Sequence, residues 1–269
     1  MRHWPTKALL TFAAVVALAA PVIGETQGNN GYLTPEAFNI LPVLPPAPVK
    51  GDARYAADRA IFKKTRQWVG TARWDFATAD VQGKPADMLR NFSCAAGVTL
   101  TPENAPRLAA LIGKAGNDTR RETNISKDVN KRVRPFLIDK VPDAKICEPK
   151  KGLADSYDYP SGHATWGWTW ATILAELVPD HAAAILTRGR AYGESRVVCG
   201  AHNWSAVENG RLSASVTLTA VRSTPEYKAD FAAAQAEIDA LRKSGTAPDA
   251  AICQKEAELA GENILTPRK

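Results

Sequence analysis

Three short segments of the sequence carry residue types that together could hold a phosphate and transfer it. They are Lys127 with Arg134-Pro135, then Pro160-Ser161-Gly162-His163, then Ser195-Arg196 followed by His202. Three cations and the free amides of a Ser-Gly helix start can hold a phosphate. Two histidines, half of the four in the chain, can supply a nucleophile and an acid for phosphoryl transfer.

Each segment taken alone also has an ordinary structural explanation. Lys127 and Arg134 are seven residues apart, so on a helix both would face one side and could form a solvated basic stripe. The Pro-Ser-Gly-His tetrapeptide could be a capped helix start. A single histidine near a helix start, such as His202, is more often a structural residue than a catalytic one. The three segments in this order favour chemistry over these separate explanations.

The order Lys-x6-Arg-Pro, Pro-Ser-Gly-His, Ser-Arg-x5-His resembles the signature of the phosphatidic acid phosphatase type 2 superfamily. Within that superfamily, the chain is similar to the bacterial class A non-specific acid phosphatases. The resemblance includes Tyr32-Leu33, the stretch from Leu41 to Pro48, Phe92-Ser93-Cys94 and the helical region to about Ala240. It implies a single-domain helical bundle of the class A acid phosphatase and vanadium haloperoxidase type.

The resemblance also implies a role for each signature residue. His202 would be the nucleophile that forms a phosphohistidine, and His163 the general acid that protonates the leaving alcohol. The implied phosphate ligands are Lys127, Arg134, Ser161, Gly162 and Arg196. Fixed cations and amides can neutralise a phosphoryl group without a metal, so we expect metal-independent hydrolysis of phosphomonoesters and no cofactor.

The sequence departs from the family signature at Ala206, four residues after His202, where the family has an aspartate. That aspartate orients the nucleophilic histidine, and its loss is expected to cost on the order of 10²–10⁴ in kcat. Glu208 lies about 200° further round a helix than Ala206 and would face the wrong way. Asn209 lies near the correct face, and a backbone carbonyl or a water could also replace the carboxylate.

Three interpretations of Ala206 therefore remain open. The chain is a phosphatase with reduced or differently supported activity, a form altered to trap a bound state, or a relative that binds phosphate or a phosphoester without turnover.

A vanadate-dependent haloperoxidase is disfavoured because those chains are usually much longer. A lipid phosphatase is disfavoured because the sequence lacks multiple membrane spans. Four tryptophans near the motifs are core residues or could stack on a leaving group: Trp166, Trp168, Trp170 and Trp204.

The elements that must position these residues are predicted to be helices almost throughout, in one all-α domain. Convincing alternation of apolar and polar residues, as expected of strands, is absent. Caps, prolines and apolar periodicity indicate the helix bounds. The predicted helices are Thr101–Gly116 with Thr101 as N-cap, Asp118–Arg134, Ala164–Leu177, Asp180–Glu194, Trp204–Val221, Pro225–Leu241 and Asp249–Gly261.

The first residues predict export. A positive start, an apolar run from Ala8 to Ala20 and small residues near Gly24 are typical of a cleaved signal segment, so we expect a periplasmic protein. We predict a signal peptide over 1–24, an extended arm over 25–50 and the helical domain over 51–269. No later run of about 18 apolar residues indicates a stable membrane span.

Composition limits the partners and the covalent framework. The formal net charge is +6, without basic blocks interleaved with aromatics, so a small phosphoester or inorganic phosphate is a better partner than nucleic acid. Four cysteines in an exported chain suggest two disulfides, and the three possible connectivities stay open: Cys94, Cys147, Cys199 and Cys253. No Cys-x-x-Cys spacing suggests a metal site, and a homo-oligomer remains open.

Overall fold

The computed structural model describes Met1 and residues 31–138 and 145–266. The predicted signal peptide, apart from Met1, and the first residues of the predicted arm lie outside this part of the chain. Within the described residues the chain forms helices joined by turns and loops, without any strand. The predicted all-α fold is therefore confirmed, whereas the limits of arm and domain stay predictions.

The structure contains both long α-helices and short helical turns. In chain order they are α1 (Ala53–Thr65), η1 (Arg66–Trp68), α2 (Ala72–Ala79), α3 (Pro85–Ala96), α4 (Pro106–Asn130), α5 (Pro135–Ile138), α6 (Lys150–Leu153), α7 (Gly162–Leu177), η2 (Pro179–His181), α8 (Ala182–Val198), α9 (Trp204–Val221), α10 (Pro225–Ser244) and α11 (Ala250–Gly261).

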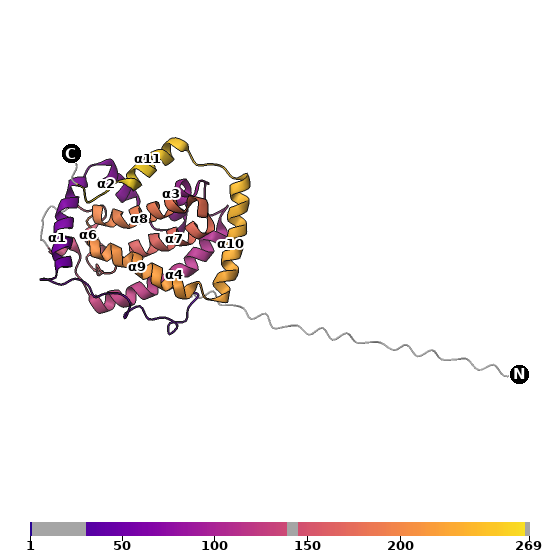
Figure 1. Cartoon of the computed structure of the whole chain (residues 1–269), viewed down its shortest axis with the longest axis horizontal. Helices are drawn as coiled ribbons and strands as arrows, with labels where there is room; N and C mark the ends of the chain where they lie inside the picture. The colour runs from indigo at the N-terminus through magenta and orange to yellow at the C-terminus, as the bar shows by residue number, and fades with distance from the viewer. Residues whose placement is uncertain (2–30, 139–144, 267–269) are drawn as a thin grey trace.

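Helix α7 lies at the centre of the fold, with α8, α9 and α4 packed against it (Figure 1). Three of its large apolar side chains, Trp170, Ile173 and Leu174, are completely buried, and Trp166 and Trp168 are partly buried. Helices α2, α3 and α11 cover α8, and α10 packs against α4. Burying an apolar helix in this way removes a large apolar surface from water, and that stabilises the fold. The central helix is consequently a rigid support for the Pro-Ser-Gly-His segment at its beginning.

The segment over residues 31–50 lies alongside α4. Backbone amides of this segment donate to side chains of the helix: Tyr32 to Asp118 (2.6 Å), Ile40 to Glu122 (3.3 Å) and Ala47 to Asn130 (2.7 Å). Since a loop has no backbone ladder of its own, these side chains supply the acceptors that its amides need.

The two helices predicted over Thr101–Gly116 and Asp118–Arg134 are in fact one helix, α4. Gly116 does not end a helix, because it is the point where the ring of Trp166 reaches the α4 backbone. A Cβ on Gly116 would lie 2.2 Å from Trp166 Cζ3. The glycine therefore permits a close approach between α4 and α7, and such tertiary packing is invisible in the local pattern of a helix end.

Both ends of α4 also differ from the prediction. Thr101 is not the N-cap: its amide donates to Asn104 Oδ1 (2.8 Å) in a turn, and the helix starts at Pro106. At the other end the helix stops at Asn130, and Lys131 adopts a left-handed conformation with φ +46°. Arg134 therefore lies beyond the helix, and the expectation that Lys127 and Arg134 share one helical face is wrong.

The other predicted helices are confirmed with small shifts at their ends. The observed bounds are Gly162–Leu177, Ala182–Val198 after the η2 turn, Trp204–Val221, Pro225–Ser244 and Ala250–Gly261. Two N-cap side chains bond to amides in the first turn of their own helix. Thr224 accepts from the amide of Tyr227 (3.3 Å), and Asp249 accepts from that of Ile252 (2.9 Å).

The four cysteines form two disulfides, Cys94–Cys253 and Cys147–Cys199. This resolves the three connectivities that the sequence left open. The first joins α3 to α11, and the second joins the segment before α6 to the end of α8. Among the described helices, none has the length and apolar character to cross a bilayer.

We expect a Gly210→Ala variant to be less stable by about 1–3 kcal/mol, because α9 passes very close to the beginning of α7 there. A Cβ on Gly210 would lie 2.5 Å from the backbone oxygen of Ser161, an atom that cannot move without shifting α7. Denaturant unfolding measures the change. Gly113→Ala in α4 is the matched control, since nothing lies within 4 Å of its Cβ position. It should be neutral or stabilising. Equal stability of the two variants would contradict this packing.

Candidate active site

The three signature segments meet where α4 ends, α7 begins and the chain turns from α8 into α9. Lys127, in the last turn of α4, has its Cε 3.9 Å from the position that a Cβ on Gly162 would occupy. Arg134 Nη1 lies 3.1 Å from His202 Nε2. These contacts bring residues from all three segments to one site.

The beginning of α7 presents free backbone amides. Ser161 is the N-cap, and its Oγ accepts from the amide of Ala164 (3.2 Å). Its own amide donates to Ala206 O (2.9 Å), so the segment is fixed against α9. The amides of Gly162 and His163 lie in the first turn, where a helix has no internal acceptors and carries the positive end of its dipole. This helix start can bind an anion.

A sharp turn after α8 brings His202 back beside Arg196. Gly200 has φ +74°, a conformation that favours glycine. The turn lets the amides of Ala201 (3.0 Å) and His202 (3.2 Å) both donate to Arg196 O. A Cβ at residue 200 would also lie 2.5 Å from the guanidinium of Arg66. The spacing of Arg196 and His202 in the sequence therefore has a geometric cause.

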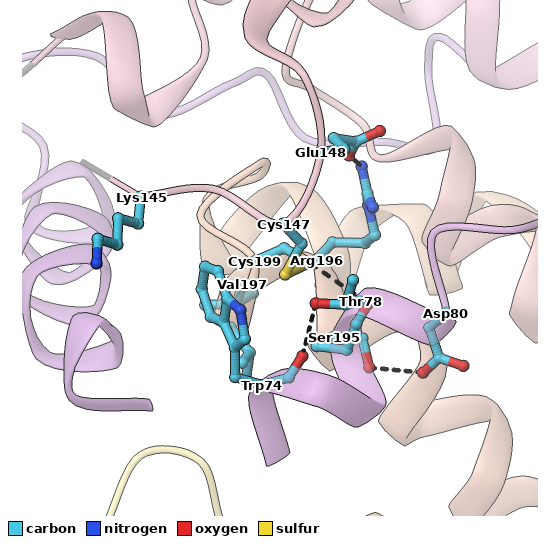
Figure 2. Close-up of a disulfide and its surroundings, with 12 residues drawn as sticks. Trp74, Thr78, Asp80, Lys145, Cys147, Glu148, Ser195, Arg196, Val197 and Cys199 are labelled. Carbon is cyan, nitrogen blue, oxygen red and sulfur yellow. Dashed lines mark hydrogen bonds and ion pairs between the residues drawn. A yellow bond between two sulfur atoms is a disulfide. The ribbon is translucent and has the colours of Figure 1, made fainter. Parts of the chain in front are cut away.

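Arg196 is buried and only partly bonded. Its Nη2 forms an ion pair with Glu148, which follows Cys147 of the Cys147–Cys199 disulfide (Figure 2). Its Nε and Nη1 have no acceptor among the described residues. A buried N–H without an acceptor is costly, and a guanidinium donates readily to phosphate oxygens. The free edge of Arg196 is thus suited to an anionic ligand.

Arg134 is held in one position by the chain around it. Its Nε donates to Ser156 O (3.0 Å) and its Nη2 to Ser156 Oγ (2.7 Å). Its Nη1 donates to Ala201 O (2.8 Å) and faces His202 Nε2. Burial lowers the pKa of Arg134 to about 10, which leaves it charged at neutral pH. The side chain is a fixed cation beside the predicted nucleophile.

The ring of His202 is bonded through both nitrogens. Its Nδ1 lies 3.0 Å from Asp158 Oδ1, and its Nε2 faces the guanidinium of Arg134. Arginine has only donors and a carboxylate only acceptors, so Nδ1 carries the proton and Nε2 the lone pair. Burial, followed by Arg134, Lys127 and Arg196, lowers the pKa of His202 well below its usual value. The ring is therefore neutral, and its lone pair lies on Nε2, where it accepts from the Arg134 guanidinium.

Asp158 is the residue that sequence reasoning missed. Asn209, one of the candidate substitutes, instead donates its Nδ2 to Ser205 O (2.9 Å) within α9, and the acceptor for His202 Nδ1 is Asp158. Glu208 is exposed, in agreement with its predicted direction. An acidic residue two positions before Pro160, in a chain with Ala206, was the available signal. The role of Asp158 depends on its contact with His202, which lies 44 residues away in the sequence.

His163 is oriented by two partners on one nitrogen. Its Nε2 lies 2.7 Å from Asp80 O and 2.9 Å from Tyr192 Oη, and its ring stacks on that of Tyr192. A carbonyl only accepts, so Nε2 carries a proton; Nδ1 has no partner within the described part of the chain. Loss of water, then Arg196 and Arg134, lowers the pKa of His163 to about 3.

The lowered pKa of Lys127 predicts an alkaline limit on activity. Its Nζ donates to Tyr157 O (2.7 Å), and burial together with Arg134 lowers its pKa to about 8. Lysine is charged below its pKa, so kcat/KM should fall as the pH rises through about 8. A pH profile of kcat/KM measures this limit, and Lys127→Arg should move it upward because arginine stays charged. An alkaline limit at the same pH in both proteins would assign it to another group.

A cavity of about 280 Å³ opens beside the first turn of α7. Its walls include Gly162, Trp166, Gly83, Gly116, Thr165 and Arg120. Of the four tryptophans noted in the sequence, Trp166 lines this cavity, and Trp170 is completely buried in the core. No group of three or more metal-binding side chains occurs among the described residues.

Comparison with known proteins supports the assignment of the fold and of the class of enzyme. Residues 108–230 match the model of the PAP2 superfamily. The chain is 40% identical over 215 residues to an acid phosphatase of Zymomonas mobilis, covering 79% of this chain and 80% of that protein. It is 32% identical over 247 residues to a non-specific acid phosphatase of Providencia stuartii, covering 88% and 99% of the two chains. A Salmonella typhimurium non-specific acid phosphatase is 30% identical over 210 residues, 76% and 82% of the two.

The helical fold and these relatives define a phosphatase enzyme. The chain belongs to the PAP2 superfamily and, within it, to the bacterial class A acid phosphatases.

Proposed function

We propose that this protein hydrolyses small phosphomonoesters without a metal, through a phosphohistidine at His202. The observation that carries the proposal is the state of the His202 ring: Nδ1 is bonded to a carboxylate, and Nε2 faces a fixed cation. A neutral imidazole with that tautomer is a nucleophile, and the cation beside it is where a phosphoryl group would bind. The relatives named acid phosphatases support the reaction class.

In the first half of the reaction, the phosphoryl group binds between the cations and the beginning of α7. The groups assigned to its oxygens are Lys127, Arg134, Arg196, Ser161 and the amide of Gly162. His202 Nε2 attacks phosphorus, the bond from phosphorus to the ester oxygen breaks, and His163 gives its proton to that oxygen. The transferred group is then bonded to Nε2.

His163 must be protonated for this step, although its pKa in the free protein is about 3. Arg196 and Arg134 contribute to that low value, and a bound phosphoryl group offsets their charge. Substrate binding therefore raises the pKa of His163 toward the acidic range in which the enzyme would work. In the second half, neutral His163 takes a proton from water, the water oxygen attacks phosphorus, and the bond to Nε2 breaks to release inorganic phosphate.

The cavity beside Gly162 is the proposed position of the leaving group. It adjoins the first turn of α7, and Trp166 offers an apolar wall to an aromatic or nucleoside alcohol. We also expect the protein to be exported to the periplasm, because the first 24 residues resemble a cleaved signal.

The experiment is hydrolysis of p-nitrophenyl phosphate by the mature chain between about pH 4 and about pH 8, with EDTA present. Acid-labile, base-stable phosphate on the protein during turnover would identify a phosphohistidine. We expect turnover in EDTA and labelling that is absent from His202→Ala. Binding of inorganic phosphate without turnover of any ester would instead indicate a relative that only binds phosphate. Activity that disappears with EDTA would contradict the metal-independent mechanism.

A further inference from the structure

We infer that Asp158 is the positioning residue of His202 and replaces the aspartate that the family signature has at position 206. This inference rests on the proposed function, because it assigns a partner to the proposed nucleophile. Asp158 Oδ1 accepts from His202 Nδ1 at 3.0 Å, and the side chain is completely buried. The carboxylate comes from the loop before α7 and not from the first turn of α9.

The carboxylate is held firmly enough to orient a ring. Asp158 Oδ1 also accepts from the amide of Asn203 (3.0 Å), and Oδ2 accepts from Asn203 Nδ2 (2.8 Å). Arg132 Nε lies 3.6 Å from Oδ2, and the amide of Asp158 donates to Arg132 O (2.8 Å). The donors surround both oxygens, so the carboxylate has one orientation. Since Asn203 directly follows His202, the same contacts fix the backbone of the nucleophile.

The alanine at position 206 agrees with the inference that Asp158 supplies the carboxylate for His202. Ala206 is completely buried, and its carbonyl accepts from the amide of Ser161 (2.9 Å). The chain from Asp158 to Ser161 therefore lies against the first turn of α9. An aspartate at 206 would add a second buried carboxylate to a site where His202 Nδ1 has only one proton to donate. A small apolar residue avoids that repulsion.

The main alternative is that Asp158 only anchors α9 to the preceding loop. Asp58 offers a matched control for that role. It is also buried, its Oδ2 pairs with Arg132 Nη2 (2.7 Å), and its Oδ1 accepts from a backbone amide of α9, that of Ser205 (2.8 Å). Asp58 has no contact with His202 among its bonds to described residues. Loss of Asp58 should therefore reproduce the structural cost without the catalytic one.

The experiment compares Asp158→Asn with Asp58→Asn in the full mature chain. Both should lower the thermal midpoint. Asp158→Asn should lower kcat by on the order of 10²–10⁴ and slow formation of the phosphoenzyme, with inhibition by inorganic phosphate little changed. Asp58→Asn should keep most of its kcat. A folded Asp158→Asn protein with the kcat of Asp58→Asn, in a series where His202→Ala is inactive, would overturn the inference. An active His202→Ala protein would instead overturn the proposed function.

A relocation test asks whether the carboxylate can be moved. Ala206→Asp alone should lower stability and leave kcat unraised, because His202 already has its acceptor. The same change combined with Asp158→Ala should recover kcat at least about tenfold over Asp158→Ala. A tenfold gain in kcat from Ala206→Asp alone would show that Asp158 does not perform this role.

The tautomer can be measured without a variant that risks misfolding. In ¹⁵N-histidine spectra of the unmodified protein, the ring of His202 should show a protonated Nδ1 and an unprotonated Nε2. The resonance is identified by its disappearance in His202→Ala. A ring protonated at Nε2 alone would exclude the bond from Nδ1 to Asp158 and overturn the inference.

Discussion

Replacing His202 by alanine should lower kcat for p-nitrophenyl phosphate by on the order of 10⁵–10⁶, since removing the nucleophile of a covalent hydrolase costs about that much. The proposed first step forms a bond from His202 Nε2 to phosphorus, and no other group is proposed to accept the phosphoryl group. The remaining cations and amides should still bind phosphate, so inhibition by inorganic phosphate should persist. The measurement is steady-state kcat together with the amount of acid-labile phosphoprotein.

His181→Ala is the control for His202→Ala. His181 lies in η2 and its Nδ1 contacts Ala95 O at 3.2 Å, away from the signature residues. It should retain the kcat of the unmodified chain. Comparable activity in His202→Ala and His181→Ala would require a different nucleophile, such as water, and would contradict the covalent mechanism.

Replacing Arg196 by alanine should cost on the order of 10³–10⁵ in kcat, the range for an arginine that stabilises a transferring phosphoryl group. Arg196 presents Nε and Nη1 without an acceptor in a buried position, so the interaction with phosphate oxygens is not shared with other protein groups. Arg196→Lys should lie between, because lysine keeps the charge and loses the two-pronged geometry.

Two controls separate this effect from side effects of the change. Arg190→Ala makes the same substitution on the same helix, where Arg190 pairs with Glu194 (2.8 Å) outside the site, and should keep its activity. Arg196→Ala also leaves Glu148 without its partner. The double variant Arg196→Ala with Glu148→Gln removes that charge, and recovery of full activity in it would mean that Arg196 only neutralises Glu148.

The sequence predicted what depends on neighbouring residues. Helix α10 begins at Pro225 as expected, and α11 begins one residue after the expected Asp249, because the start of a helix depends on the residues of its own first turn. Helix α9 begins and ends at the predicted residues, Trp204 and Val221. The signature indicated which groups could gather around a phosphate, because its residue types and order are themselves the chemical information.

Tertiary structure decided what depends on segments that are distant in the chain. Whether Gly116 ends a helix depended on Trp166, and the disulfide pairs close spans of 52 and 159 residues. The acceptor for His202 Nδ1 likewise depended on a segment that is distant in the chain. Local periodicity tested only residues on α9, such as Asn209, whereas Asp158 reaches the ring from another loop. Packing of separate segments determines such contacts, and a single sequence carries no rule of spacing for them.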